Sequence, residues 1–314
     1  MADELTDQEI EGDDIDPVGA RVIPDLLVVL VVGLVGAAMG PLLLVKVYHV
    51  FDHAKITARL WEWVFILGVE TSFWALAFVP LWSSVRRLWR FTATTNAERL
   101  KLFAFVVLLG VLAGIPLFTA HRLGFFSPLD RQFKPLELLV AIGCIVAAPG
   151  VIGIWLVDRC VAQRLSPDRG VAQIVTYLRL KRYLDVYRSF LGIMLGLVVL
   201  AAGAQRAAIV AATHGTGFRP VFVLLFGGYN TLLLAVVYVP AYLRLVATGR
   251  EIVDGIEPIP KKEKDMAVAL AQRQTLVNLF GLETSATDKL KSALFLLAPV
   301  FSSIVVTITG AGAT

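Results

Sequence analysis

The sequence has little charge, little cysteine and no basic N-terminal leader. Only 17% of its 314 residues are charged, against about 25% in an ordinary soluble protein. Its two cysteines exclude a disulfide framework, and no CxxC pair is present. The first 20 residues hold eight acidic side chains and neither Lys nor Arg, which excludes a secretory signal. Insertion into a membrane would therefore depend on the chain's own apolar segments.

The motifs of common enzyme chemistry are also missing. The chain has no GxxxxGK[ST] phosphate loop, no GxSxG nucleophile turn, no HExxH zinc motif and no GxGxxG dinucleotide fingerprint. It has no TVGYG-like filter either, because FGGYN at 226–230 shares only a Gly-Tyr pair. No basic soluble module is present for a nucleic acid. These absences argue against an enzyme and against a nucleic-acid binder, and they leave the identity of any cofactor unknown.

Apolar residues dominate what is present. They make up 57% of the chain, and the mean hydropathy is +0.74. Runs that reach or approach the roughly 20 residues needed to cross a bilayer predict an all-α, polytopic membrane helical bundle. The six expected transmembrane helices are 24–47, 63–83, 102–120, 136–157, 189–212 and 221–242. A last apolar run, 290–309, contains Pro299 and reads as a seventh C-terminal span or an interfacial helix, with the span slightly favoured.

The bundle divides the chain into four parts. An acidic tail at 1–23 is expected to be disordered. The six-helix transmembrane bundle at 24–244 includes an amphipathic basic loop at 158–188. A linker with a short amphipathic helix follows at 245–288, and the C-terminal apolar helix occupies 289–314.

The distribution of basic residues predicts the orientation. On one side of the expected spans lie 21 Lys and Arg residues and on the other side seven, with Arg206 inside a span. Cytoplasmic loops carry the excess of Lys and Arg. The N-terminus and the long basic loop are therefore expected in the cytoplasm, and the bacterial inner (plasma) membrane is the expected location.

Polar side chains inside the expected spans form the main candidate site. Depths counted from the predicted helix ends put Glu70, Arg206 and Asn230 roughly 12, 9 and 14 Å below the outer surface. A Glu70–Arg206 ion pair completed by Asn230 would lower the cost of burying the charges. Such a layer would either hold helices together or form a permeation or binding site. The full predicted intramembrane polar layer is Glu70, Thr71, Gln205, Arg206, Asn230 and Thr231.

The stretch around Glu70 has a counterpart farther along the chain. ETSFWALAFVPLW at 70–82 resembles NTLLLAVVYVPAY at 230–242, which hints at a parallel internal repeat. Each copy carries a proline ten residues after its first polar residue, Pro80 and Pro240. Proline removes one helical hydrogen bond, so these positions are candidate hinges or simple kinks.

Four histidines fall on the expected outer side. They are candidates for a metal or haem site or for a pH sensor, although ordinary histidines at helix ends are the favoured interpretation. The pair at positions 49 and 53 has the i, i+4 spacing that would put both rings on one helix face. The four residues are His49, His53, His121 and His214.

Two further surfaces are predicted to make contacts. Four basic residues of the amphipathic stretch 171–188 would bind anionic lipid headgroups at the cytoplasmic face. These are Arg179, Lys181, Arg182 and Arg188. Three GxxxG motifs, at 36–40, 110–114 and 192–196, indicate close helix packing, within the bundle or in a homo-oligomer.

Three functions fit this sequence. The favoured one is a channel or transporter using the polar layer. The first alternative is a non-catalytic membrane scaffold or effector subunit of a larger complex. The second alternative is a membrane protein that binds metal or haem through the outer histidines.

Overall fold

The computed structural model describes residues 30–38, 42, 58–122, 134–165, 172–212, 220–256, 266–282 and 297–305. All regular structure in these ranges is helical, which confirms the predicted all-α class. Six helices carry labels: α2 (Ala58–Phe91), α3 (Asn96–Arg122), α4 (Lys134–Arg164), α5 (Ala172–Ala212), α6 (Pro220–Ile256) and α7 (Met266–Phe280). Shorter helical segments cover 30–38 and 297–305.

Within the described ranges, the five helices α2 to α6 are long and apolar enough to cross a membrane. They contain the predicted second to sixth spans. The first predicted span is described only over 30–38, and the last apolar run only over 297–305. Whether those two runs cross a membrane therefore stays a prediction.

Two helices are much longer than predicted. α5 has 41 residues, so it is about 62 Å long, twice the roughly 30 Å hydrocarbon core of a bilayer. The amphipathic stretch 171–188 is not a separate element, because no proline interrupts the chain between it and the apolar run. α6 continues to Ile256, so the expected linker from 245 is helical over its first part.

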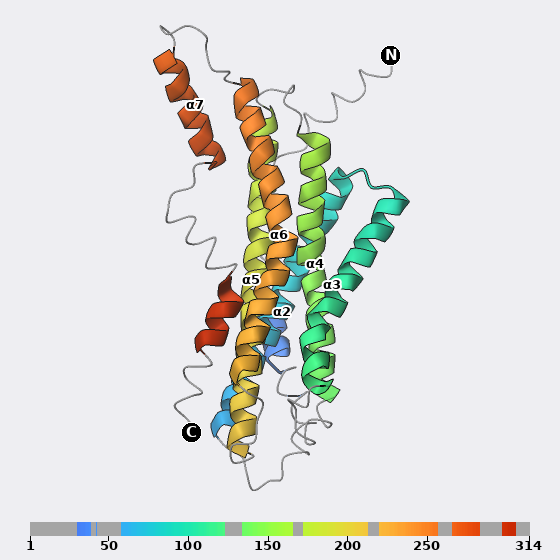
Figure 1. Ribbon diagram of the computed structural model, residues 1–314. Helices are drawn as coiled ribbons and strands as arrows, with labels where there is room; N and C mark the ends of the chain where they lie inside the picture. The colour runs from blue at the N-terminus through green and yellow to red at the C-terminus, as the bar shows by residue number, and fades with distance from the viewer. Residues whose placement is uncertain are drawn as a thin grey trace.

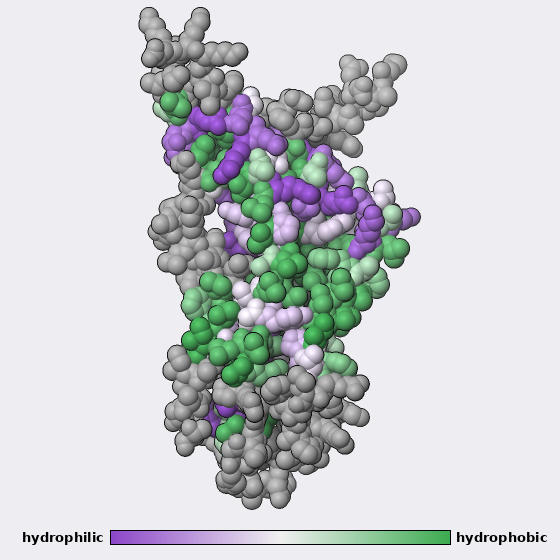
Figure 2. All heavy atoms as spheres, viewed as in Figure 1, coloured by the Kyte–Doolittle hydropathy of each residue, from purple (hydrophilic) through white to green (hydrophobic). Residues whose placement is uncertain are grey.

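α5 lies at the centre of the bundle (Figure 1). It packs against α2, α4, α6 and α7, whereas α3 leans on α4 and α6 from outside. One end of the bundle, here called the polar end, is where α2, α4 and α6 finish and α3 and α5 begin. Figure 2 shows hydrophilic side chains gathered toward this end and apolar side chains over the part below it.

Glycines allow the central helices to approach closely. A Cβ on Gly150 of α4 would lie 2.9 Å from Leu191 of α5, and a Cβ on Gly153 would collide with the Tyr187 ring. The Tyr187 hydroxyl also hydrogen-bonds Ser84 of α2 at 2.7 Å. One fully buried tyrosine therefore joins α2, α4 and α5.

The segment 30–38 packs against α2 at a similar small-residue contact. Thr71 donates a hydrogen bond to the Gly36 carbonyl at 2.5 Å, and Ser72 donates one to the Gly33 carbonyl at 3.1 Å. A Cβ on Gly36 would lie 2.8 Å from both the Ser72 Cα and the Thr71 carbonyl oxygen. The predicted packing role of this glycine is confirmed at this contact.

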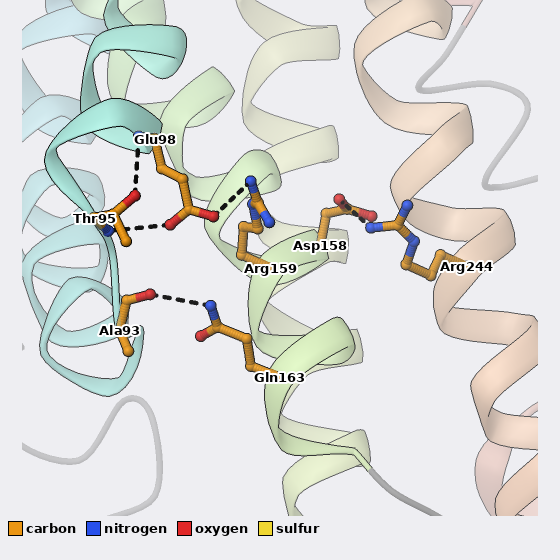
Figure 3. Close-up of polar contacts among 7 residues, drawn as sticks. All are labelled: Ala93, Thr95, Glu98, Asp158, Arg159, Gln163 and Arg244. Carbon is orange, nitrogen blue, oxygen red and sulfur yellow. Dashed lines mark hydrogen bonds and ion pairs between the residues drawn. The ribbon is translucent and has the colours of Figure 1, made fainter.

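Ion pairs tie the helices together at the polar end (Figure 3). Thr95 and Glu98 form a reciprocal capping box, with hydrogen bonds of 3.1 and 3.3 Å, at the start of α3. Glu98 also pairs with Arg159 of α4 at 2.8 Å. Asp158, the neighbour of Arg159, pairs with Arg244 of α6 at 2.7 Å. α4 is therefore linked to both α3 and α6.

α7 folds back onto this end of α5 and α6. Its last residue, Phe280, is fully buried and lies 4.5 Å from the Tyr177 ring between centroids. Lys181 of α5 donates a hydrogen bond to the Phe280 carbonyl at 2.7 Å. Gly281 has φ +60°, the left-handed conformation that commonly ends a helix. A helix is present where the short amphipathic one was predicted, but its apolar side chains do not all face the bundle, since Leu270 and Leu279 are 49% and 52% exposed. An ion pair between Arg273 and Asp254 links the helix to α6.

We expect Gly36→Ala to lower the free energy of unfolding by about 1–3 kcal/mol, because its new methyl group overpacks the contact with α2. Gly110→Ala on α3 is the matched control, since a Cβ there meets nothing within 4 Å. Alanine favours a helix over glycine by about 1 kcal/mol in both variants. Thermal unfolding of the detergent-purified protein measures the difference, and equal effects of the two substitutions would contradict the contact.

Candidate intramembrane polar site

The segment 297–305 contacts both α5 and α6, so it allows the level of their residues, meaning the position along the bundle axis, to be compared. A Cβ on Gly196 of α5 would contact Ala298 and Ser302, and one on Gly227 of α6 would contact Pro299 and Ser303. These four contacts lie on consecutive turns of one short helix, so Gly196 and Gly227 are level with each other. Asn230 lies three residues after Gly227, about 4.5 Å nearer the polar end.

An aromatic contact gives the level of Glu70. Phe73 of α2 stacks on Phe190 of α5 with ring centroids 5.6 Å apart. Phe190 is six residues before Gly196, about 9 Å nearer the polar end. α2 runs toward the polar end, so Glu70, three residues before Phe73, lies about 4.5 Å farther from that end than Phe73 does. Glu70 is therefore about 4.5 Å nearer the polar end than Gly196. Glu70 and Asn230 therefore lie at about the same level, as expected for matching positions of the proposed repeat.

Gln205 and Arg206 lie far from that level. Arg206 is ten residues beyond Gly196 on α5, so it is roughly 19 Å along the bundle from Asn230. The structure therefore separates the predicted polar layer into two levels. The expected Glu70–Arg206 ion pair is not among the ion pairs of the described residues. Depths counted from predicted helix ends missed this, because the two ends are not level: α5 ends 16 residues beyond Gly196, whereas α6 begins only seven residues before Gly227.

Glu70 is enclosed by the bundle. It is 3% exposed, as are Asn230 and Gln205, and Thr71 is 4% exposed. Thr71 is satisfied by the Gly36 and Leu67 carbonyls, and the Asn230 amide donates to the Phe226 carbonyl of its own helix at 2.8 Å. No hydrogen bond or ion pair with a described residue reaches the Glu70 carboxyl group. At this level Glu70 is thus an ionisable side chain whose carboxyl group no described residue satisfies.

Polar atoms near Glu70 share this property. Trp74 is one turn from Glu70 and Trp63 is two turns away on the same face of α2. Both indole N–H groups are buried without an acceptor among the described residues. The hydroxyl of Thr231, next to Asn230, is also buried without a described partner. Buried polar atoms of this kind are normally satisfied by ordered water, so Trp63, Trp74 and Thr231 mark candidate water positions inside the bundle. Nothing in the sequence pattern singled out the two tryptophans.

Tyr229, beside Asn230, supplies a hydrogen-bond donor that α3 lacks because of a proline. Pro116 has no N–H, so the Leu112 carbonyl four residues earlier lacks its helical donor. The Tyr229 hydroxyl donates to that carbonyl at 2.7 Å. The start of the 230–242 stretch is therefore fastened to α3, the helix with the fewest buried residues among the five candidate spans.

The remaining predicted residues lie elsewhere or outside the described ranges. Pro80 and Pro240 both sit inside continuous helices, α2 and α6, and their role as hinges stays a prediction. His49, His53 and His214 lie outside the described residues, and of His121 only the backbone, in α3, is described. Among described side chains, no group of three His, Cys, Asp or Glu residues could hold a metal ion.

Arg188 differs from the other three predicted lipid-binding residues. It is 7% exposed, and its guanidinium donates to the Tyr238 hydroxyl at 3.2 Å and pairs with Asp185 at 3.3 Å. This position inside the bundle does not fit a headgroup contact at the surface. Arg182 is exposed, and Arg179 and Lys181 are half-buried.

Five helices long and apolar enough to cross a membrane indicate an α-helical, membrane-embedded protein. No protein-family model matches the chain, and neither does any curated protein or solved structure. The residues of the site therefore carry the evidence for a function.

Tyr229→Phe should lower the free energy of unfolding by about 1 kcal/mol, because it leaves the Leu112 carbonyl unsatisfied. The same substitution in a Pro116→Ala background should cost much less, because replacing the proline restores the helical N–H donor. Unfolding of the four proteins in mixed micelles gives the coupling between the two sites. An equal loss in both backgrounds would contradict the role assigned to Tyr229.

Proposed function

We propose that this chain is a transport protein, a channel or transporter, with Glu70 as an internal site for a small cation such as the proton. The main support is that the Glu70 side chain is 3% exposed and that its carboxyl group has no partner among the described residues. An ionisable group inside a membrane protein is costly to keep, and such residues commonly mark ion pathways and proton relays.

The choice between a structural and a functional Glu70 depends on Arg206. A purely structural carboxylate would be expected to pair with a cation or to accept several hydrogen bonds. Arg206, the intramembrane cation of the sequence, lies roughly 15 Å farther along α5 than Gly196. The ion pair that would have held the helices together is missing from the described residues, which favours the interpretation of Glu70 as a site.

Unsatisfied donors on the same face of α2 support a hydrated route to Glu70. Trp63 and Trp74 each leave a buried indole N–H without a described acceptor. Trp63 lies on the side of Glu70 that is away from the polar end, as do Gln205 and Arg206. Water beside Trp63 would connect Glu70 with the end of the bundle opposite the polar end, which the basic-residue count predicts to lie outside the cell.

Glu70→Gln keeps the size of the side chain and removes its ability to carry a charge. We expect it to lower proton or alkali-cation flux at least about tenfold, equivalent to 1.4 kcal/mol of lost stabilisation. Glu62→Gln is the control on the same helix, because Glu62 is exposed and forms only a surface pair with Arg59. Proteoliposomes with an internal pH dye, and with imposed sodium or potassium gradients, measure the flux.

Wild-type flux that persists unchanged in Glu70→Gln would contradict the proposed site. Arg206→Gln, tested in parallel, should have a smaller effect because Arg206 lies at a different level. The folded state of each variant is checked by its thermal unfolding, so that a loss of flux is not a loss of protein.

A second candidate is a scaffold or effector subunit. The observation that favours it is the polar end, where α5 and α6 extend past their apolar parts and α7 docks against them through Phe280. Such a platform suits binding of further subunits. Co-purifying partners together with no flux for any tested cation would favour this function over transport.

A further inference from the structure

An open groove runs along α5 between the two docked C-terminal elements. Its volume is about 450 Å³, and it is lined by Leu178, Lys181, Arg182, Asp185, Val186 and Ser189. These residues recur every three or four positions, so they form a single stripe about 16 Å long on the helix. At one end Lys181 holds the end of α7, and beyond the other end Gly196 contacts Ala298.

The groove crosses the boundary between the charged and the apolar parts of α5. From Ser189 to the end of α5 the only charged residue is Arg206. Over residues 179–188, just before Ser189, five side chains are charged. Val186 is 45% exposed, and Ile193, two turns farther into the apolar part, is 38% exposed. The groove therefore offers a charged half and, beyond it, an apolar track toward the membrane interior.

Positive charge exceeds negative charge in the charged half. Lys181 and Arg182 face one carboxylate, Asp185, which Arg188 partly neutralises at 3.3 Å. The Lys181 ammonium donates hydrogen bonds to the Phe280 carbonyl at 2.7 Å and, more weakly, to the Gly281 carbonyl at 3.5 Å, which leaves one of its three donors for another acceptor. Arg182 is exposed, and Ser189 adds a hydroxyl group at the apolar edge.

We propose that this groove binds the phosphate headgroup of an anionic phospholipid from the leaflet at the polar end. Lys181 and Arg182 meet the phosphate, and an acyl chain follows Val186 and Ile193. A soluble phosphate compound would gain nothing from the apolar track, whereas a phospholipid needs both halves at this boundary. The site would tie α5, α7 and the membrane surface together, and it stands independently of the transport site at Glu70.

Native mass spectrometry of the full-length, detergent-purified protein tests the site. Phosphatidylglycerol is added in one series and phosphatidylcholine in another. We expect one phosphatidylglycerol to be retained preferentially, and Arg182→Gln to weaken its binding about fivefold, the effect of one basic residue at an anionic surface. Arg250→Gln on α6 is the matched control, because Arg250 is exposed near the polar end but does not line the groove.

Val186→Glu provides a second, independent variant, since it places a carboxylate on an exposed position of the groove without removing a buried contact. It should reduce phosphatidylglycerol retention while thermal unfolding without added lipid stays unchanged. Equal retention of the two lipids, or wild-type retention by Arg182→Gln and Val186→Glu, would overturn the proposal. Displacement of the lipid by millimolar inorganic phosphate would instead assign the groove to a soluble phosphate ligand and overturn the lipid assignment.

Discussion

The described bundle depends on Tyr187 and the glycine beneath it. The Tyr187 ring of α5 occupies the space that a side chain at Gly153 of α4 would fill, and its hydroxyl bonds Ser84 of α2. In a membrane the hydrophobic effect does not drive helices together, so close packing and interhelical hydrogen bonds must do so. One residue supplies both interactions to three helices, and the same combination recurs where Thr71 meets Gly36.

The packing around glycines holds the apolar parts of the helices together, and some helices extend past these parts. α5 and α6 continue past their apolar parts, and there the contacts change from glycine and aromatic packing to ion pairs such as Asp158–Arg244. The change follows from the solvent, because charged groups are far less costly where water reaches them. α7 uses both kinds of contact, burying Phe280 beside Tyr177 and pairing Arg273 with Asp254.

Glu70 differs from the buried polar residues next to it, whose side chains have hydrogen-bond partners. Its neighbours Thr71 and Ser72 have carbonyl acceptors, and Asn230 uses its own helix. A carboxyl group kept at the same level without a described partner is an exception that stability alone does not explain. Exceptions of this kind are expected at functional sites.

The sequence by itself determined the helical class, the apolar segments, the concentration of basic residues toward one end and the presence of the short helix α7. These follow from composition and periodicity, which act within one segment at a time. The tertiary structure decided which polar residues share a level. Register between helices depends on individual contacts, such as Phe73 on Phe190 and Gly196 and Gly227 on the segment 297–305. Hydropathy does not encode those contacts, so Glu70 and Asn230 meet at one level while Arg206 lies well beyond them.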